Sequence, residues 1–582
     1  MIAGGRTAAA ATLLAAAALL AGRAALYASP YLVLDDAFIS FRYADNLAHG
    51  LGLVYNAGER VEGYTNFLWT ALLAAGARLG LSLPRLAVAL ALGAALATLP
   101  LLLGLARAVA GWGPHAVLLA ALPPLLVAAM GSQARLAMSG METLPFVLLL
   151  TLAAWLLFLR DRPAAAGVAF AAAALTRPEG AMYALVALAT IALGDESPRR
   201  EQLKRALRLL LPLVAIYLPY FLWRWHYYGD LLPNTFYAKA SGFSWERLQR
   251  GVDLLLEIAA SWSVYPLCAL ALLSLPSVLR SGSPPLSRRS ADASASVSAA
   301  GIRAGEDAGA PREEKRVLVV WSWLTVVVTL TYFVWVGGDF LAFFGPRFLL
   351  PALPALLLLA TDGARRLADL LPAPAARTAS VALAAAVLLG CAAWLSWPAR
   401  LSRQPGLAFE MAGWTRLGLW LRDAVPPGTI AVGAAGVIPY VSHLPAIDMF
   451  GLTDRHIAHL PPPRVAGTVA HEKYDPEYVL GRRPDYLIST RIDAAGRPTT
   501  AGLGRVLPLV DACYSLLAVV KTRGEWPADD RWVVAPERYG PELFAAGYRM
   551  GVFRRRQGQR AGRCRQWLDG IGILENAGAA AP

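Results

Sequence analysis

Two adjacent aspartates, Asp35 and Asp36, open the polar segment that follows the first apolar run of the chain. Paired acids just beyond a membrane helix could supply a base that deprotonates a sugar hydroxyl, or ligands for a divalent ion. A carboxylate close to lipid has a raised pKa unless a cation keeps it ionised, and Arg42 and Arg60 are candidate cations. The structural alternative is that either aspartate caps a helix that starts near Ala37. The residues by themselves leave both interpretations open.

Further polar side chains stand out because charge is scarce between the apolar runs. Lys239 follows an aromatic belt at Trp223–Tyr228, and it could neutralise a lipid phosphate or merely extend its amine to water. Arg347 heads an apolar helix, where a lone guanidinium is costly unless it is paired or functional, and its planar fork suits a phosphate. For Arg177 and Glu179, a structural ion pair explains the sequence at least as well as a substrate contact.

Several kinds of site are disfavoured by spacing. His456, His459 and His471 have no Glu or Cys at ligand spacing, so we predict no metal site there. The four cysteines show no metal or CxxC spacing, and no disulfide framework follows from them. The sequence contains no nucleotide-binding loop of the Walker type, which argues against a nucleotide-driven pump.

The elements that must position these side chains are membrane helices. The chain has 582 residues, of which 57% are apolar and only 16% charged, and its mean hydropathy is +0.47. These values argue against an ordinary soluble protein. Most of the apolar runs are close to the length that a bilayer-spanning helix needs. The runs lie at about 8–28, 64–82, 86–106, 114–131, 142–159, 163–175, 181–194, 206–223, 262–280, 317–336, 347–362 and 375–395.

The basic residues predict the orientation of these helices. Segments 199–208, 280–316 and 364–366 carry clustered Arg and Lys and should face the cytoplasm. By alternation, 29–63, 224–261, 337–346 and everything after 396 should lie outside. An inner N-terminus and an outer C-terminus require an odd number of spans, so we expect about eleven. The net charge of +14 then reports topology, and no nucleic-acid partner is predicted.

The chain divides into two predicted parts. Residues 1–395 form the membrane module, with the outer loop 29–63 and a disordered cytoplasmic linker at 281–311 that is rich in Ser, Ala, Gly and Pro. Residues 396–582 should form a soluble α/β domain outside the membrane. Its strands are expected at Thr429–Ala434, Ala446–Phe450, Pro484–Ser489, Leu516–Val520 and Gly547–Arg554.

The block Asp35–Trp69 resembles the first external loop of the terminal β-(1→2) arabinofuranosyltransferases of mycobacterial-type cell walls and of their wider bacterial relatives. Further blocks resemble the same family in the same order, so that the likeness spans nearly the whole chain. These blocks are Ser139–Thr143, Thr176–Gly180, Leu232–Lys239, Gly337–Asp339 with Arg347–Pro354, and Gly436–His459.

The resemblance implies a GT-C glycosyltransferase, which is a polytopic α-helical enzyme of the bacterial inner membrane with an extracytoplasmic active site. It implies a polyprenyl-phosphate sugar donor resembling decaprenylphosphoryl-arabinose, a cell-envelope glycan as acceptor, and contact with membrane lipid. Asp35 or Asp36 would be the catalytic base, and Arg347, Lys239 and Arg42 would hold the donor phosphate. The sugar contacts would come from Glu62, Tyr64, Asn66, Asn234 and Asp339. The resemblance does not identify a cofactor. The paired acids Asp35 and Asp36 are compatible with a divalent cation.

Two alternatives remain. The same fold could transfer another polyprenyl-linked sugar, such as mannose, to lipopolysaccharide, pilin or protein. A non-enzymatic transporter of lipid-linked sugars would place charge in mid-span and use paired broken helices, whereas most of the charge here lies in the predicted outer loops.

Overall fold

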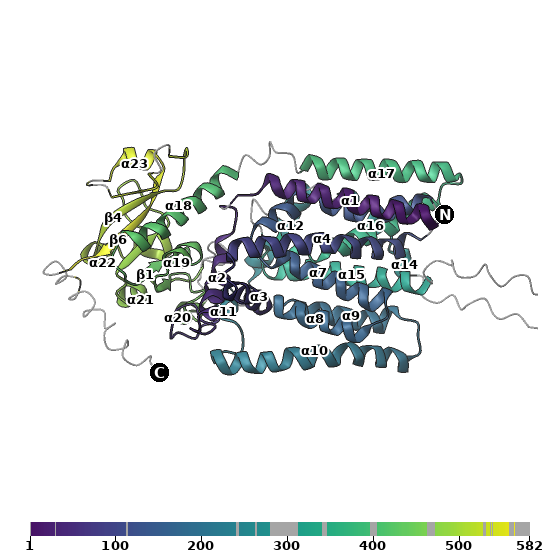
Figure 1. Ribbon diagram of the computed structural model, residues 1–582, viewed down its shortest axis with the longest axis horizontal. Coiled ribbons are helices and arrows are strands. Elements are labelled where there is room, and N and C mark those ends of the chain that lie inside the picture. The colour runs from purple at the N-terminus through teal and green to yellow at the C-terminus, as the bar shows by residue number, and fades with distance from the viewer. Residues whose placement is uncertain are drawn as a thin grey trace, which may run out of the picture.

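The computed structural model describes residues 2–29, 31–111, 114–239, 244–261, 265–279, 312–339, 346–395, 404–461, 472–527, 531–535, 537, 539–557 and 564. A bundle of long helices forms the first part of the molecule, and a mixed sheet with short helices forms the second (Figure 1). The predicted linker 281–311 and His471 lie outside the described residues.

The long helices follow the apolar runs. Leu- and Ala-rich segments favour helix, and the prolines at the starts of α8 and α17 need no backbone N–H there. Close packing depends on small residues: a Cβ on Gly167 of α8 would lie 2.1 Å from the carbonyl oxygen of Leu209 in α10. The helices are α1 (Ile2–Leu26), α3 (Phe67–Arg78), α4 (Leu83–Ala110), α5 (Pro114–Ala129), α7 (Thr143–Ala154), α8 (Pro163–Thr176), α9 (Gly180–Gly194), α10 (Arg199–Tyr228), α12 (Trp245–Ser261), α13 (Tyr265–Leu272), α15 (Arg312–Trp335), α16 (Ala352–Asp369) and α17 (Pro374–Leu395).

Short elements connect these helices and shape their ends. The adjacent prolines Pro123 and Pro124 lie inside α5, which meets α6 at a bend of 50°. The connectors are α2 (Asp35–Ala48), α6 (Gly131–Met138), the π-helix η1 (Trp155–Leu159), α11 (Asn234–Lys239), α14 (Pro276–Leu279) and the 3₁₀ turn η2 (Arg347–Leu349).

The described helices have the lengths and composition of a multi-pass membrane protein. Four of them are long and apolar enough to cross a membrane, and up to six crossings result if each of two bent helix pairs is one span. Shorter apolar helices accompany them at Phe67–Arg78, Thr143–Leu159, Pro163–Thr176, Gly180–Gly194 and Pro374–Gly390. The total of about eleven spans stays a prediction.

One sequence expectation for the helical part needs correction. The run 262–280 is not one continuous helix, because α13 ends at Leu272 and α14 begins at Pro276. The last part of segment 224–261 is α12, which packs along α15, and the side of the membrane on which this segment lies stays a prediction. Gly251 of α12 permits this approach, since a Cβ there would lie 2.6 Å from the carbonyl oxygen of Val334.

The second part of the chain is built on a six-stranded sheet of order β2-β1-β3-β6-β4-β5. β1 is parallel to β2 and β3, and the remaining pairs are antiparallel. Five strands were predicted at these places, and each is confirmed; β5 has two residues, too few to leave a pattern. The strands are β1 (Ile430–Val432), β2 (Ala446–Asp448), β3 (Tyr486–Ser489), β4 (Tyr514–Lys521), β5 (Val533–Val534) and β6 (Tyr548–Arg555).

Short helices surround this sheet, and α18 is the longest of them. It packs against both α19 and β4. The helices are α18 (Gln404–Asp423), α19 (Val437–Ser442), α20 (Arg455–Ala458), α21 (Pro476–Gly481), the 3₁₀ segment η4 (Thr500–Arg505), α22 (Leu507–Cys513) and α23 (Pro541–Ala545).

A disulfide joins Cys513, at the end of α22, to Cys564. The expectation that no disulfide follows from the cysteines was therefore wrong. The two residues are 51 positions apart in the sequence, and only the fold brings their Cα atoms to 4.8 Å.

The first loop joins the two parts of the molecule, because its side chains bond to the backbone around β1 and β2. The Tyr55 hydroxyl donates to the Ala435 carbonyl over 2.6 Å, and Asn56 Nδ2 donates to the Ala446 carbonyl over 2.9 Å. The sheet thus lies at the end of the bundle where α2, α3 and α11 gather (Figure 1). Most of the predicted site residues lie at this end.

Candidate active site

Asp35 is the first residue of α2, and its side chain holds another helix. Its Oδ1 accepts from the Val437 amide over 2.7 Å, and its Oδ2 accepts from the Gly436 amide over 3.1 Å. These amides begin α19, where the helix dipole favours a carboxylate. Gly436 is required here, since a Cβ would lie 1.9 Å from the Asp35 carbonyl oxygen. The alternative that either aspartate caps a helix near Ala37 is not found: α2 starts at Asp35 and its N-cap is Leu34, with no side-chain hydrogen bond.

The environment of Asp35 changes its acidity. The pKa of Asp35 is raised to about 7, chiefly by burial and to a lesser extent by the neighbouring charge of Asp36, and the amides of Val437 and Gly436 oppose this shift. A carboxyl group with this pKa exchanges protons near neutral pH.

Asp36, Arg347 and Asp339 form a cluster beside Asp35. The Arg347 guanidinium binds Asp339 through two hydrogen bonds, from Nε to Oδ2 over 3.0 Å and from Nη2 to Oδ1 over 3.1 Å. Arg347 Nη1 lies 3.6 Å from Asp36 Oδ2, and the Asp36 side chain is 44% exposed. Burial lowers the pKa of Arg347, but the two aspartates outweigh it and hold that pKa above its usual value. The structure thus brings together three predicted residues from segments some 300 positions apart.

A buried polar network lies under this cluster. Arg177 Nη1 binds Glu142 Oε1 over 3.0 Å, and Arg177 Nη2 binds Glu179 Oε1 over 3.1 Å. Asn66 Nδ2 donates to the other Glu142 oxygen over 2.8 Å. The Arg177 guanidinium also lies 5.1 Å from the ring of Phe348, the residue after Arg347. The structural ion pair expected between Arg177 and Glu179 is present, and it supports the backbone that carries Arg347.

The remaining predicted sugar contacts are directed into the protein. Glu62 receives the Arg224 guanidinium, with Nε 2.9 Å from Oε2, and the Tyr228 hydroxyl donates to the Tyr64 hydroxyl over 3.2 Å. Burial raises the pKa of Glu62 to about 7, against the opposing effect of Arg224. Asn234 Nδ2 donates to the carbonyls of Gly451 and Leu452, each over 2.9 Å. The side chains of this group are all buried, namely Glu62, Tyr64, Asn66 and Asn234. Their proposed contacts with sugar stay predictions.

Two of the predicted phosphate ligands, Arg42 and Lys239, are not part of the Asp36–Arg347–Asp339 cluster. Arg42 donates to the carbonyls of Tyr55, Pro439 and Leu444 over 2.6–2.8 Å, so its guanidinium ties the first loop to the sheet part. Arg42 also lines a small cavity with Asn56 and Arg482, and its role as a phosphate ligand stays a prediction. Lys239, at the end of α11, is exposed.

Sequence reasoning missed Arg224 as the partner of Glu62. The signal was present, because Arg224 interrupts the aromatic belt at Trp223–Tyr228 and a lone guanidinium in an apolar run needs a partner. Nothing in the spacing indicated which of the acids would supply it. In the part of the chain that the structure describes, no group of three or more His, Cys, Asp or Glu side chains is placed to hold a metal ion.

A second charged cluster lies at the opposite end of the bundle, near α14 (Figure 1). Asp362 is fully buried and binds Lys315 Nζ over 2.9 Å, Arg365 Nη2 over 3.0 Å and Arg366 Nε over 2.9 Å. The Ser277 hydroxyl donates to the same carboxylate over 2.6 Å. These basic residues come from the segments expected to face the cytoplasm.

The chain has a relative among characterised proteins. It is 35% identical over 234 residues to the terminal β-(1→2)-arabinofuranosyltransferase of Mycobacterium tuberculosis. The predicted resemblance is confirmed. The matched segment covers 37% of this chain and 36% of that relative, which is less than the near-complete likeness expected from the sequence blocks. A family model described as a domain of unknown function (DUF8728) matches residues 405–541, from α18 to the start of α23.

Solved structures with a comparable outline are more distant. An oligosaccharyltransferase of Archaeoglobus fulgidus, tethered with an acceptor peptide, is 13% identical with a TM-score of 0.49, over 93% of this chain and 77% of that one. ArnT of Cupriavidus metallidurans bound to undecaprenyl phosphate is 15% identical with a TM-score of 0.46, over 76% of this chain and 85% of that one.

Proposed function

We propose that the chain is a GT-C glycosyltransferase that transfers a sugar from a polyprenyl-phosphate donor to a cell-envelope glycan. Arabinofuranose is the sugar that we favour. The observation that carries the proposal is the cluster of Asp36, Arg347 and Asp339 beside a proton-exchanging Asp35, in a chain that resembles an arabinofuranosyltransferase. The cluster combines a candidate base with a cation suited to phosphate, and the exposed Asp36 marks its open side.

In the proposed mechanism Asp35 is the base. Its carboxylate takes the proton of the acceptor hydroxyl while the hydroxyl oxygen attacks the anomeric carbon of the donor sugar. The bond between that carbon and the phosphate oxygen breaks, and the phosphate leaves with the electron pair. The pKa of about 7 favours Asp35 for this role, because a base that titrates near the working pH is both ionised and able to hold a proton.

Arg347 would stabilise the departing phosphate. Its Nε and Nη2 bind Asp339, so Nη1, on the side of Asp36, is the nitrogen that a phosphate oxygen would reach. Asp339 then fixes the plane of the guanidinium and Asp36 borders the phosphate site. Lys239 is proposed as a second cation, because it is exposed at the end of α11.

We place this site on the extracytoplasmic face of the plasma membrane. Lys315, Arg365 and Arg366 gather at the opposite end of the bundle, as the positive-inside rule expects of a cytoplasmic end. The disulfide between Cys513 and Cys564 supports the same orientation, because disulfides persist in oxidising compartments.

The test is transfer by the purified full chain in lipid nanodiscs, supplied with decaprenylphosphoryl-arabinose or a polyprenyl-phosphate mannose and an envelope glycan extract. We expect labelled arabinose in the glycan, and loss of this product with Asp35→Asn. Transfer of mannose alone would rule out arabinose as the donor sugar and support the alternative, a polyprenyl-phosphate mannose donor. Movement of donor lipid across the bilayer of sealed proteoliposomes, without any transfer, would identify a transporter instead.

A further inference from the structure

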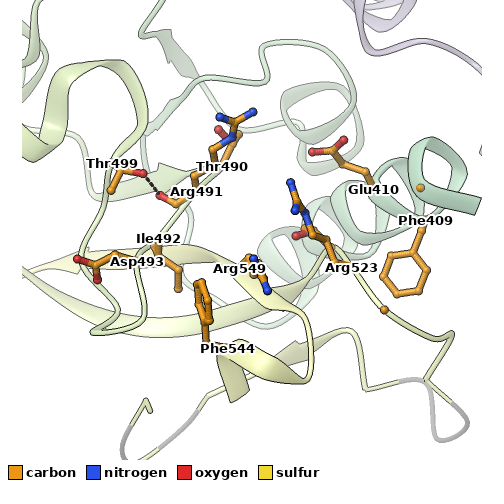
Figure 2. A pocket seen from close by; sticks show the side chains of 13 residues that line it. Phe409, Glu410, Thr490, Arg491, Ile492, Asp493, Thr499, Arg523, Phe544 and Arg549 are labelled. Carbon is orange, nitrogen blue, oxygen red and sulfur yellow. Dashed lines mark hydrogen bonds between the residues drawn. The ribbon is translucent and has the colours of Figure 1, made fainter. Parts of the chain in front are cut away.

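A cavity of about 680 Å³ lies in the sheet part of the molecule, apart from the Asp36–Arg347–Asp339 cluster. Its walls come from the first turns of α18, the loop that follows β3, the turn that follows β4, and from α23 and β6 (Figure 2). The volume is within the range of about 300–1,000 Å³ that is usual for small-molecule sites. The size therefore admits a ligand of mono- to disaccharide dimensions.

Three arginines from separate segments line this cavity: Arg491, Arg523 and Arg549. Among the residues that the structure describes, no carboxylate forms an ion pair with any of these guanidinium groups. Arg549 lies over the ring of Phe544, with 4.1 Å between the guanidinium carbon and the ring centre, and its Nε is buried without a partner in the described residues. A stacked arginine of this kind presents a fixed plane of N–H groups.

The acids of the cavity do not cancel this charge. Asp493 is committed elsewhere, because its carboxylate accepts from Arg497 Nε over 2.8 Å and from the amides of Ala495 and Arg497 over 2.9 Å. Glu410 is the other acid of the lining, and burial raises its pKa, although Arg491 and Arg523 act in the opposite direction. Glu410 is therefore the one lining acid without a hydrogen-bonded arginine among the described residues, and both Arg491 and Arg523 act on it.

We propose that this cavity binds an acidic saccharide, meaning a sugar unit that bears a carboxylate or a phosphate. Arg491 and Arg523 would bind the anionic group, since guanidinium matches both anions through paired hydrogen bonds. The Thr490 hydroxyl offers a partner for a sugar hydroxyl, and the wall made by Arg549 and Phe544 offers a flat surface for the ring of the sugar. The site is separate from the transfer chemistry, and its occupation does not require Asp35.

The experiment measures binding to the full chain in neutral-lipid nanodiscs, in the Asp35→Asn background, so that the result is independent of transfer. The probes are digalacturonic acid and glucose 1-phosphate, with galactobiose as the neutral control and inorganic phosphate as the bare anion. We expect saturable binding of at least one acidic sugar, and about tenfold or weaker affinity in the double variant Arg491→Ala/Arg523→Ala. Galactobiose should bind at least about tenfold more weakly.

The matched control is Arg422→Ala, which removes an exposed arginine of α18 that is paired with Asp423 and does not line the cavity. This variant should bind the acidic sugars as the parent chain does, and Arg549→Gln should weaken binding without loss of the sheet signal in circular dichroism. Three results would overturn the proposal: no saturable binding of either acidic sugar up to about 10 mM, equal binding by the double variant, or equal binding of galactobiose. Displacement of the acidic sugars by phosphatidylglycerol vesicles at low concentration would assign the arginines to a lipid surface instead.

Discussion

At the end of the bundle away from the sheet, Asp362 is fully buried between Lys315, Arg365 and Arg366, whereas at the sheet end Asp36 is 44% exposed and lies 3.6 Å from Arg347. Both clusters use the same residue types. In the first, both carboxylate oxygens bind cations at hydrogen-bonding distance. In the second, Arg347 is bound to Asp339 by two hydrogen bonds, and Asp36 is a more distant and partly exposed partner.

The comparison separates a buried, fully paired arrangement of charge from the one that we propose to be functional. A buried carboxylate needs partners to offset its desolvation, and Asp362 has them within the protein. At the sheet end, Asp35 has a raised pKa, and the partly exposed Asp36 lies beside the buried Arg347. Strongly perturbed acidity is common among functional side chains. Substitutions at the two ends should therefore affect different measurements.

The largest expected effect is on catalysis at Asp35. Asp35→Asn should lower kcat/KM for sugar transfer by about 10²–10⁴-fold, because a positioned base contributes this much. Transfer in nanodiscs gives the rate, and a thermal melt checks that α19 remains docked. The matched variant at the opposite end of the bundle is Asp362→Asn. The folded fraction of this variant should transfer sugar at close to the parental rate. Equal losses in both variants would remove the distinction between the two ends.

Arg347→Ala should come next, with a loss of about 10²–10³-fold in kcat, as when one electrostatic contact to a developing charge is removed. Arg365→Ala takes the same side chain from the opposite cluster and should leave kcat nearly unchanged. Steady-state kinetics with the lipid donor distinguish the two. A normal kcat with Arg347→Ala would mean that another cation holds the phosphate.

The reverse asymmetry is expected for stability. Asp362→Asn should destabilise the protein by about 3–5 kcal/mol, because it leaves Lys315, Arg365 and Arg366 without their buried partner. Asp36→Asn, at an exposed position, should change stability by less than about 1 kcal/mol. Denaturation in detergent measures both. Similar melting temperatures for the two variants would contradict the structural role of Asp362.

The smallest effect concerns pH. With Asp35 as the base, kcat/KM should fall below about pH 7, since the raised pKa leaves the group protonated there. The charge of Asp36 contributes to that shift, so Asp36→Asn should move the bend of the profile to lower pH. A profile measured from pH 5 to 9 tests this. A bend that stays in place, or moves upward, would assign the titration to another group.

Much of the local structure was predictable from the sequence. The apolar runs gave the positions of the long helices, and β-rich segments between turns gave five of the six strands, because both patterns reflect which faces of a segment are buried. The 262–280 run failed for a local reason: continuous apolarity does not reveal that α13 stops at Leu272 and a separate α14 follows.

The candidate site was predictable only in part. Asp35, Asp36, Asp339 and Arg347 stood out because charges are rare between apolar runs, and three of them meet in one cluster. Arg42 stood out for the same reason but binds backbone carbonyls. Scarcity of charge identifies residues that need a partner, and it does not say whether that partner is a substrate or the protein itself.

By itself, then, the sequence determined a polytopic membrane protein with a sheet-bearing C-terminal part and a short set of charged candidates, because hydrophobic patterning is a local property. The tertiary structure alone decided that Asp35 holds the amides of Gly436 and Val437, that Asp36 faces Arg347, and that Cys513 pairs with Cys564. Those contacts join residues 51 to about 400 positions apart, and their partners are chosen by how the helices and the sheet pack. The acidity of Asp35 follows from that packing, since burial is its largest cause.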